Sequence, residues 1–294
     1  MNRVGCGSSF KTQITELKRV FLIFCGIFVS IMIMAPVFGS QLDMDGPSLE
    51  MGSIDWEKRV VRAKGIGVPP NKAVNPTQSR VMTQRAARIV AYQRLLEVTE
   101  NIQVDSQTVV KNYILESDVV RTRVSGMVRG AQVVEERAFP DGSYEVTLEM
   151  NLKNLDGYLN TQIPSNPNPK SPEFSIRKKP EHHQVDYTGL LINAQGLQIS
   201  ECLFPKIKMS DGQVVYSRDN VQADLDSGIA GYVRGVTEAT SHDKVRDNPL
   251  IVKALGVDKG NPTDLVIHEA DAQLIHLEPK NLEFLREGKV VIAY

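Results

Sequence analysis

The chain has 294 residues, of which 41% are hydrophobic and 23% are charged, and its formal net charge at pH 7 is −1. This composition is that of an ordinary globular protein, long enough for two domains that each bury a core. The absence of a basic surplus argues against a nucleic-acid partner.

The N-terminus predicts export. Three basic residues, Lys11, Lys18 and Arg19, precede an apolar run without a charge at residues 20–38, and small residues follow. This order is typical of a secretory signal, although the run also approaches the ~20 residues that span a bilayer. Residues 1–39 are therefore expected to be a cleaved signal peptide or an uncleaved inner-membrane anchor. Either way the rest of the chain crosses the membrane, to the periplasm or the outer membrane.

The cysteines do not predict a lipid anchor. Cys6 lies ahead of the apolar run and Cys25 follows Phe24 inside it, so neither follows the small residue that precedes a lipidated cysteine. After cleavage, Cys202 is the only thiol left, which excludes an intramolecular disulfide. The expected role of Cys202 is a small buried hydrophobic residue rather than an intermolecular bridge.

After an N-terminal arm at residues 40–58, residues 59–162 are expected to form a compact α+β module. Its first element is a strand at residues 59–70, with small side chains on one face. These small residues are Ala63, Gly65 and Gly67. They should allow the helix that follows to approach the sheet closely.

That helix is predicted at residues 78–101, which lack Gly and Pro and carry a broad apolar stripe. Thr77 or Ser79 is the expected N-cap. A second helix, punctuated by arginine and glycine, follows. The pattern is that of helices lying on one face of a sheet.

A hairpin closes the module. Apolar and polar residues alternate at residues 144–152, the period of a strand with one buried face. Pro140-Asp141-Gly142 supplies a tight turn before it, so residues 131–139 should pair antiparallel with it. The module is thus a β-α-α-β-β unit, with three strands and the helices on one face.

Several short motifs of the module follow one another in order. They are Ala86-Ala87, Ala91-Tyr92, Leu95-Leu96, Arg121-Thr122-Arg123-Val124 with Gly126, Val128-Arg129-Gly130-Ala131, and Pro140-Asp141-Gly142 with Tyr144 and Val146. This series resembles the twenty-kilodalton surface lipoprotein family of bacteria, which also includes proteins of the flagellar basal disk and of outer-membrane-associated motor rings. The resemblance, over about a quarter of the chain, implies a non-enzymatic and often self-assembling envelope protein with an SHS2-like α+β fold. The chain departs from the lipid-anchored members because it has no lipid-attachment motif.

Residues 163–184 are predicted to be an extended, semi-rigid linker, because five prolines interrupt a polar stretch. These are Pro164, Pro167, Pro169, Pro172 and Pro180. The adjacent imidazoles of His182 and His183 lie in this polar segment and are expected to be exposed rather than bound to metal.

Residues 185–294 are predicted to be a second α+β domain. Strands are expected at residues 190–192, 206–209, 214–216, 250–255, 265–268 and 289–294, and helices at residues 229–239 and 270–277. Asp211-Gly212 marks a hairpin turn. Tyr187-Thr188-Gly189, Asp247-Asn248-Pro249 and the motif at residues 284–288 resemble motifs that accompany the N-terminal module in other bacterial envelope proteins.

The sequence predicts no catalytic residue, cofactor site or metal site. Residues 5–12 nearly match a phosphate-binding loop, but Phe10 replaces its second glycine. Residues 224–235 resemble a calcium loop, but Gly235 stands where the bidentate glutamate belongs. The best local cluster is His268, Glu269 and Asp271, which we interpret as a strand end followed by a helix N-terminus that favours carboxylates.

The candidate interaction residues are basic and acidic groups of the N-terminal module. The sharper hypothesis pairs the arginines of one copy with acidic residues of a neighbouring copy. The arginines are Arg121, Arg123 and Arg129, and the acidic residues are Glu135, Glu145 and Glu149. The alternative is that these groups are solvated or form ion pairs within the module.

We therefore expect a structural or assembly protein of the bacterial envelope. Its expected partners are further copies of the same chain or other envelope proteins. An uncleaved leader would also attach it to the membrane. Two alternatives remain. One is a periplasmic module that captures a ligand between its two domains, and the other is a hydrolase that uses the region of residues 268–271.

Overall fold

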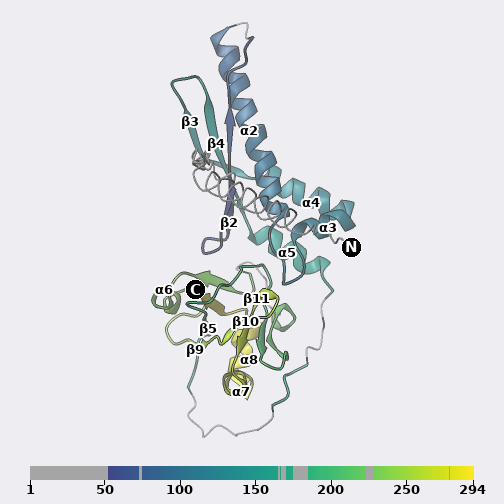
Figure 1. Ribbon diagram of the computed structural model, residues 1–294, viewed down its shortest axis with the longest axis vertical. Helices are drawn as coiled ribbons and strands as arrows, with labels where there is room; N and C mark the ends of the chain where they lie inside the picture. Colours follow the sequence, from purple (N-terminus) through teal and green to yellow (C-terminus); the bar gives the residue numbers. More distant parts are fainter. Residues whose placement is uncertain are drawn as a thin grey trace, which may run out of the picture. The chain divides into compact units, whose positions relative to one another are not determined.

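The computed structural model describes residues 52–72, 75–164, 166, 170–174, 185–222, 228–277 and 279–294. Three predicted segments lie wholly or partly outside the described residues: the leader at residues 1–39, most of the linker with His182 and His183, and the start of the calcium-loop resemblance at residues 224–227. The described residues belong to one compact unit, Glu50–Tyr294, and have the α+β architecture that the sequence predicts (Figure 1). None of the helices among them is both long and apolar enough to cross a bilayer.

The N-terminal module contains a four-stranded antiparallel sheet. Its strand order is β1 (Gly52–Asp55), β2 (Val60–Gly67), β4 (Tyr144–Asn151) and β3 (Gln132–Ala138). The predicted strand at residues 59–70 and the predicted hairpin are confirmed. The sequence did not predict β1, because its four residues are too few to establish an alternating pattern.

Helix α2 (Pro76–Glu100) packs against β2 at very short range, as the small residues of the strand predicted. A Cβ added at Gly65 would lie 2.1 Å from the carbonyl oxygen of Ala87. The prediction of the N-cap was wrong. Asn75 caps the helix, its side chain accepting a hydrogen bond from the backbone N–H of Gln78 at 2.8 Å. Pro76 follows at the first position of the helix, where its fixed φ is favourable.

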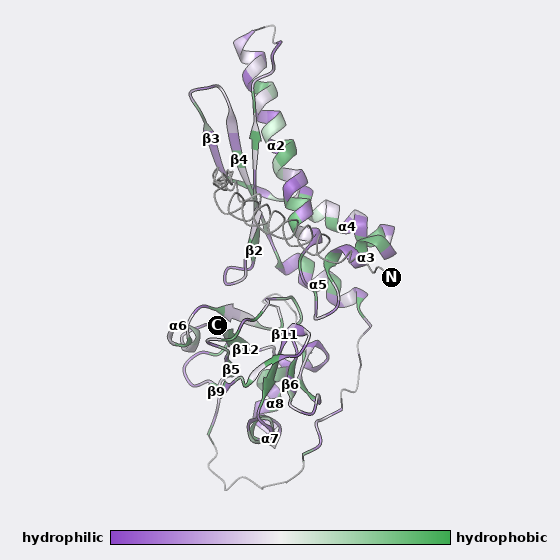
Figure 2. Ribbon diagram, in the orientation of Figure 1, coloured by the Kyte–Doolittle hydropathy of each residue, from purple (hydrophilic) through white to green (hydrophobic). Residues whose placement is uncertain are grey.

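Hydrophilic and hydrophobic residues alternate around α2 (Figure 2).

Three shorter helices complete the module: α3 (Val110–Glu116), α4 (Asp118–Arg129) and α5 (Lys153–Gln162). Helix α4 buries one valine per turn of its inner face, which places its remaining faces at the surface. These valines are Val120, Val124 and Val128.

The first of two C-terminal sheets contains the predicted hairpin. Its order is β10 (Gly256–Asp258), β11 (Asn261–Ile267), β6 (Ile207–Met209) and β7 (Val214–Tyr216), and β6 pairs antiparallel with β7. Gly212 in the connecting turn has φ +88°, which explains the glycine there.

The strands of the second C-terminal sheet are parallel throughout. Its order is β8 (Gly231–Val233), β12 (Val290–Ala293), β5 (Leu190–Asn193) and β9 (Leu250–Lys253). Parallel strands buried on both faces read as continuous apolar runs, which explains the predicted strands at residues 190–192 and 289–294. Strand β9 lies at the edge of the sheet and alternates buried and exposed residues, Ile251 keeping 53% of its accessible surface.

The C-terminal helices correct one prediction. Residues 229–239 do not form a helix, because residues 231–233 are β8 and Gly235, with φ +91°, separates them from α6 (Val236–Thr240). Helix α7 (Glu269–Leu277) confirms the prediction at residues 270–277. A 3-10 turn, η1 (Arg218–Asn220), and α8 (Pro279–Arg286) were not predicted.

Candidate interaction site

The N-terminal module contacts the C-terminal strands through a buried charged cluster. Arg59, whose φ is +54°, donates a hydrogen bond to the carbonyl oxygen of Ala230 at 3.3 Å and forms an ion pair with the fully buried Asp156 of α5. Nearby, the Lys244 ammonium donates hydrogen bonds to the carbonyl oxygens of Gly228 and Gly288 at 2.8 and 2.6 Å. One carboxylate and two cations therefore join α5 and the start of β2 to the C-terminal sheet.

Burial governs the ionisation of this cluster. It raises the pKa of Asp156 to about 6, and the attraction of Arg59 opposes the rise. Burial, reinforced by repulsion from Arg59, lowers the pKa of Lys244 to about 8. Both ionised forms are thus less stable here than in water.

Apolar and backbone contacts reinforce this junction. The Trp56 ring lies 5.6 Å from the Tyr232 ring, in an edge-on arrangement. The backbone N–H of Leu203 donates to the carbonyl oxygen of Gln103 at 3.0 Å, and the next N–H along the chain donates to Val104 at 2.8 Å. The two segments on either side of the linker share a core.

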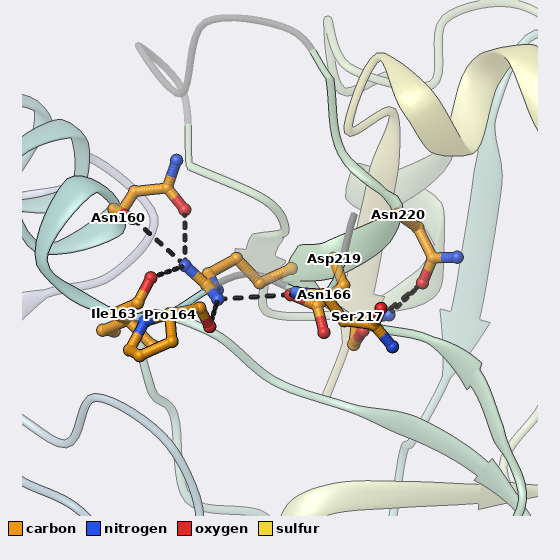
Figure 3. Close-up of polar contacts among 8 residues, drawn as sticks. Asn160, Ile163, Pro164, Asn166, Ser217, Asp219 and Asn220 are labelled. Carbon is orange, nitrogen blue, oxygen red and sulfur yellow. Dashed lines mark hydrogen bonds and ion pairs between the residues drawn. The ribbon is translucent and has the colours of Figure 1, made fainter. Parts of the chain in front are cut away.

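Arg218 of η1 forms a second contact between the two segments (Figure 3). Its guanidinium donates to the carbonyl oxygens of Asn160 and Ile163, both at 3.1 Å, and to that of Pro164 at 2.7 Å. It also pairs with Asp219 at 3.2 Å. Carbonyl groups at a helix C-terminus lack partners within the helix, so Arg218 caps α5 and holds the chain that leaves it. The sequence did not single out Arg218 or Arg59.

A groove lies between α4 and α5. We call it the α4–α5 groove; its volume is about 990 Å³. Its lining includes Val119, Thr122, Arg123, Gly126, Asn154 and Tyr158. The space beside Gly126 is open, since a Cβ added there would meet no atom within 4 Å.

Two polar groups of the α4–α5 groove have no polar partner within the described part of the chain. The guanidinium carbon of Arg123 lies 5.9 Å from the centre of the Tyr158 ring, and no acidic side chain of the described residues pairs with it. The hydroxyl of Tyr158 is buried, and no described residue forms a hydrogen bond with it. Arg123, which is exposed, therefore presents a cation to an oxygen acceptor, whereas the Tyr158 hydroxyl lies beneath the surface.

The structure separates the three predicted arginines. Arg121 pairs with Asp118 at 2.8 Å and donates to the carbonyl oxygen of Ile114 at 3.4 Å. Arg123 lines the α4–α5 groove, whereas Arg129 is exposed at the end of α4. Sequence reasoning named Arg123 but missed Tyr158, because it did not predict α5.

The three predicted acidic residues have partners in the same chain. Glu149 pairs with Arg62 at 2.6 Å, and the buried Glu145 lies 4.0 Å from Lys64. Glu135 pairs with Arg137 on its own strand at 2.9 Å, and it is the one of the three acidic residues that is exposed. These contacts fit the alternative of ion pairs within the module, and pairing with a second copy remains a prediction.

Strand β3 forms an edge of the N-terminal sheet. All seven of its residues are exposed, including Val133 and Val134, which keep 43% and 47% of their accessible surface. Among the described strands β3 pairs only with β4, and a bulge interrupts this pairing between Val133 and Glu135. The β3 edge therefore offers both unpaired backbone groups and exposed side chains.

The histidine cluster is at a helix start, as we interpreted it. Strand β11 ends at Ile267, and the Nδ1 atom of His268 accepts a hydrogen bond from the backbone N–H of Ala270 at 3.1 Å, at the start of α7. Burial raises the pKa of Asp271. Among the described residues there is no group of three or more side chains positioned to hold a metal ion.

Cys202 is a buried free thiol, as predicted. Its backbone N–H donates to the hydroxyl of Tyr232 at 3.1 Å. Burial raises the pKa of the thiol to about 12, so Cys202 is a packing residue with little thiolate at neutral pH.

These features define an α+β protein with two segments that share a core, an exposed sheet edge and a surface groove. The family model described as Treponema pallidum Tp0624, second domain, matches residues 189–294. The match begins directly before β5 and covers about a third of the chain. No curated protein matches the chain.

Proposed function

We propose that this protein is a non-enzymatic assembly protein of the bacterial cell envelope, which crosses the inner membrane by means of residues 1–39 and then binds other protein chains, including copies of itself. The observation that carries this proposal is the α4–α5 groove, where Arg123 exposes a guanidinium that has no acidic partner among the described residues. The leader and the motifs of the N-terminal module support the location. An oligomer at the outer membrane or the flagellar motor is the setting that the resemblance implies.

The physical argument concerns the guanidinium of Arg123. A guanidinium forms its strongest contacts with a carboxylate that accepts two parallel hydrogen bonds. A protein partner that carries an acidic side chain would supply such a carboxylate.

The alternative of a ligand held between the two segments has less support. Trp56, Arg59 and Arg218 already fill that junction with ring, ion-pair and hydrogen-bond contacts. The alternative of a hydrolase at residues 268–271 has less support as well, because His268 is engaged by the start of α7.

The test is the association state of the full-length chain, extracted from envelopes in mild detergent. We expect species heavier than the 32.7 kDa monomer in mass photometry, or reproducible cross-links to envelope proteins in cells. A strict monomer at micromolar concentration, without envelope partners, would contradict the proposal.

A further inference from the structure

We infer that the α4–α5 groove of one copy binds strand β3 of a second copy, with Arg123 paired to Glu135 across the contact. This inference rests on the proposed function and names its partner. The occupant is chosen by charge complementarity, because the β3 edge exposes a carboxylate and the groove exposes the cation of Arg123. The carboxylate of Asp118 also lines the groove, but it is paired with Arg121 at 2.8 Å.

Arg123 is prepared for a carboxylate. Its guanidinium carbon lies 5.9 Å from the centre of the Tyr158 ring, within the range of a cation–π contact, and its donors have no acidic partner among the described residues. Thr122 is already engaged, since its hydroxyl donates to the carbonyl oxygen of Asp118 at 2.8 Å.

Glu135 is the acidic residue best able to change partner. Its pair with Arg137 is exposed on both sides, and exposed pairs contribute little to stability. The neighbouring Glu136 is held by Arg88 at 2.7 Å and by the Tyr144 hydroxyl at 2.8 Å. Glu145 is buried and Glu149 pairs with Arg62 of β2. Glu135 is therefore the one of the three predicted acidic residues that can pair with a second copy.

Apolar side chains lie beside the charged groups on both surfaces. Val119, which lines the groove, keeps 72% of its accessible surface. Val133 and Val134 precede Glu135 on β3 and are also exposed. Contact between these valines would remove apolar surface from water, which an exposed ion pair alone does not do.

The contact is of the head-to-tail type. Helix α4 and strand β3 are at separate surfaces of the module (Figure 1), so a chain can use its groove for one neighbour and its β3 edge for another. Such heterologous contacts produce closed rings or open filaments rather than isolated two-fold dimers.

Charge reversal tests the contact in the full-length chain in mild detergent. Arg123→Glu and Glu135→Arg should each raise the apparent dissociation constant of self-association by at least about tenfold. Arg121→Gln is the control for Arg123→Gln, because Arg121 pairs with Asp118 and lies outside the groove lining. All three positions are exposed, and circular dichroism checks that each variant is folded.

Mixing the two reversed variants tests both the charge pair and the geometry of the contact. The Arg123→Glu chain keeps an intact β3, and the Glu135→Arg chain keeps an intact groove, so these two surfaces form a native contact. The two reversed surfaces are complementary to each other and form an inverted contact. The mixture should therefore restore extended assembly of alternating chains, although each variant alone is monomeric, and the double variant should restore it for the same reason.

The outcomes separate this inference from the proposed function. A wild-type oligomer that neither reversal weakens overturns the groove contact and leaves the assembly function standing. Reversals that weaken assembly without rescue in the mixture overturn the pairing of Arg123 with Glu135, and rescue that stops at dimers overturns the head-to-tail arrangement. A strictly monomeric wild-type chain without envelope partners overturns the inference and the proposed function together.

Discussion

At the residue scale, position 65 has no room for a side chain. A Cβ added there would lie 2.1 Å from the carbonyl oxygen of Ala87 and 2.3 Å from the backbone nitrogen of Ala91. Backbone atoms of a long helix move only with the helix, so Gly65→Ala should lower the free energy of unfolding by about 1–3 kcal/mol or more. Urea unfolding followed by the fluorescence of Trp56, the single tryptophan, measures this change.

Gly157→Ala is the matched control for this substitution. Gly157 lies in α5, and a Cβ added there would meet no atom within 4 Å. Alanine has the higher helix propensity, by about 1 kcal/mol, so this variant should be neutral or more stable. Equal losses of stability at positions 65 and 157 would contradict the close packing of α2 on β2.

The buried Asp156 predicts an unusual dependence of stability on pH. Because burial raises its pKa to about 6, the folded chain keeps this proton between about pH 4 and 6, where the unfolded chain loses it. The free energy of unfolding should therefore fall by roughly 3 kcal/mol as pH rises through this window. Lys244, whose pKa burial lowers to about 8, works in the opposite direction above pH 8, so this cluster contributes least between pH 6 and 8.

The Asp156→Asn variant isolates this effect, since all other titrating groups are common to both proteins. The difference in unfolding free energy between wild type and variant should decrease from pH 4 to pH 6 and then remain level to pH 8. Urea unfolding at a series of pH values provides the measurement. A difference that increases with pH over this window would show that the ion pair with Arg59 outweighs burial.

At the element scale, long or strongly patterned segments could be predicted from the sequence. The β3–β4 hairpin followed from strict alternation and a Pro-Asp-Gly turn, and α2 followed from a long apolar stripe. Helix α5 and strand β1 have only ten and four residues, so tertiary contacts rather than local periodicity determine them.

Local sequence patterns were also insufficient to identify the residues of the candidate site. Arg121 and Arg123 are indistinguishable in the sequence, because their roles depend on which face of α4 meets α5. The packing of α5 turns Tyr158 towards Arg123, whereas Arg121 points back to Asp118. Glu135 is exposed and Glu145 is buried, and this difference decides which of them can contact a second copy. The local sequence pattern does not show it.

Helix α5 should depend on Arg218. This side chain satisfies three carbonyl groups at and beyond the helix C-terminus. Arg218→Ala should lower the local opening free energy of the last turn of α5 by about 1.5–3 kcal/mol, which accelerates amide hydrogen exchange about tenfold or more. Hydrogen exchange with mass spectrometry over residues 153–164 measures this effect.

Two variants control for the loss of charge. Lys280→Ala removes a cation that pairs with Asp186 at the exposed surface, and exchange in α5 should not change. Arg218→Lys keeps the charge but lacks the planar fork, so it should behave more like the alanine variant. Normal exchange of α5 in Arg218→Ala would show that the helix end is held by other contacts.

At the scale of the whole molecule, the charged and aromatic junction joins the segments on either side of the linker. Because Trp56 and Arg59 of the N-terminal module contact strand β8 and its neighbours, the described residues pack as one compact unit. A partner bound at the α4–α5 groove or the β3 edge would thus carry both segments with it.

The leader predicts the compartment of that unit. A full-length chain with alkaline phosphatase fused after Tyr294 should be enzymatically active, because this reporter folds only where disulfides form and we expect residues 1–39 to direct the rest of the chain across the membrane. Ile27→Arg combined with Ile31→Lys places two charges in the apolar run at residues 20–38, at a cost of roughly 2.5–3.5 kcal/mol each near the centre of a spanning segment. Reporter activity should then fall while an immunoblot still detects the fusion. Equal activity with both leaders, or an inactive fusion that accumulates with the natural leader, would refute export and with it the envelope function.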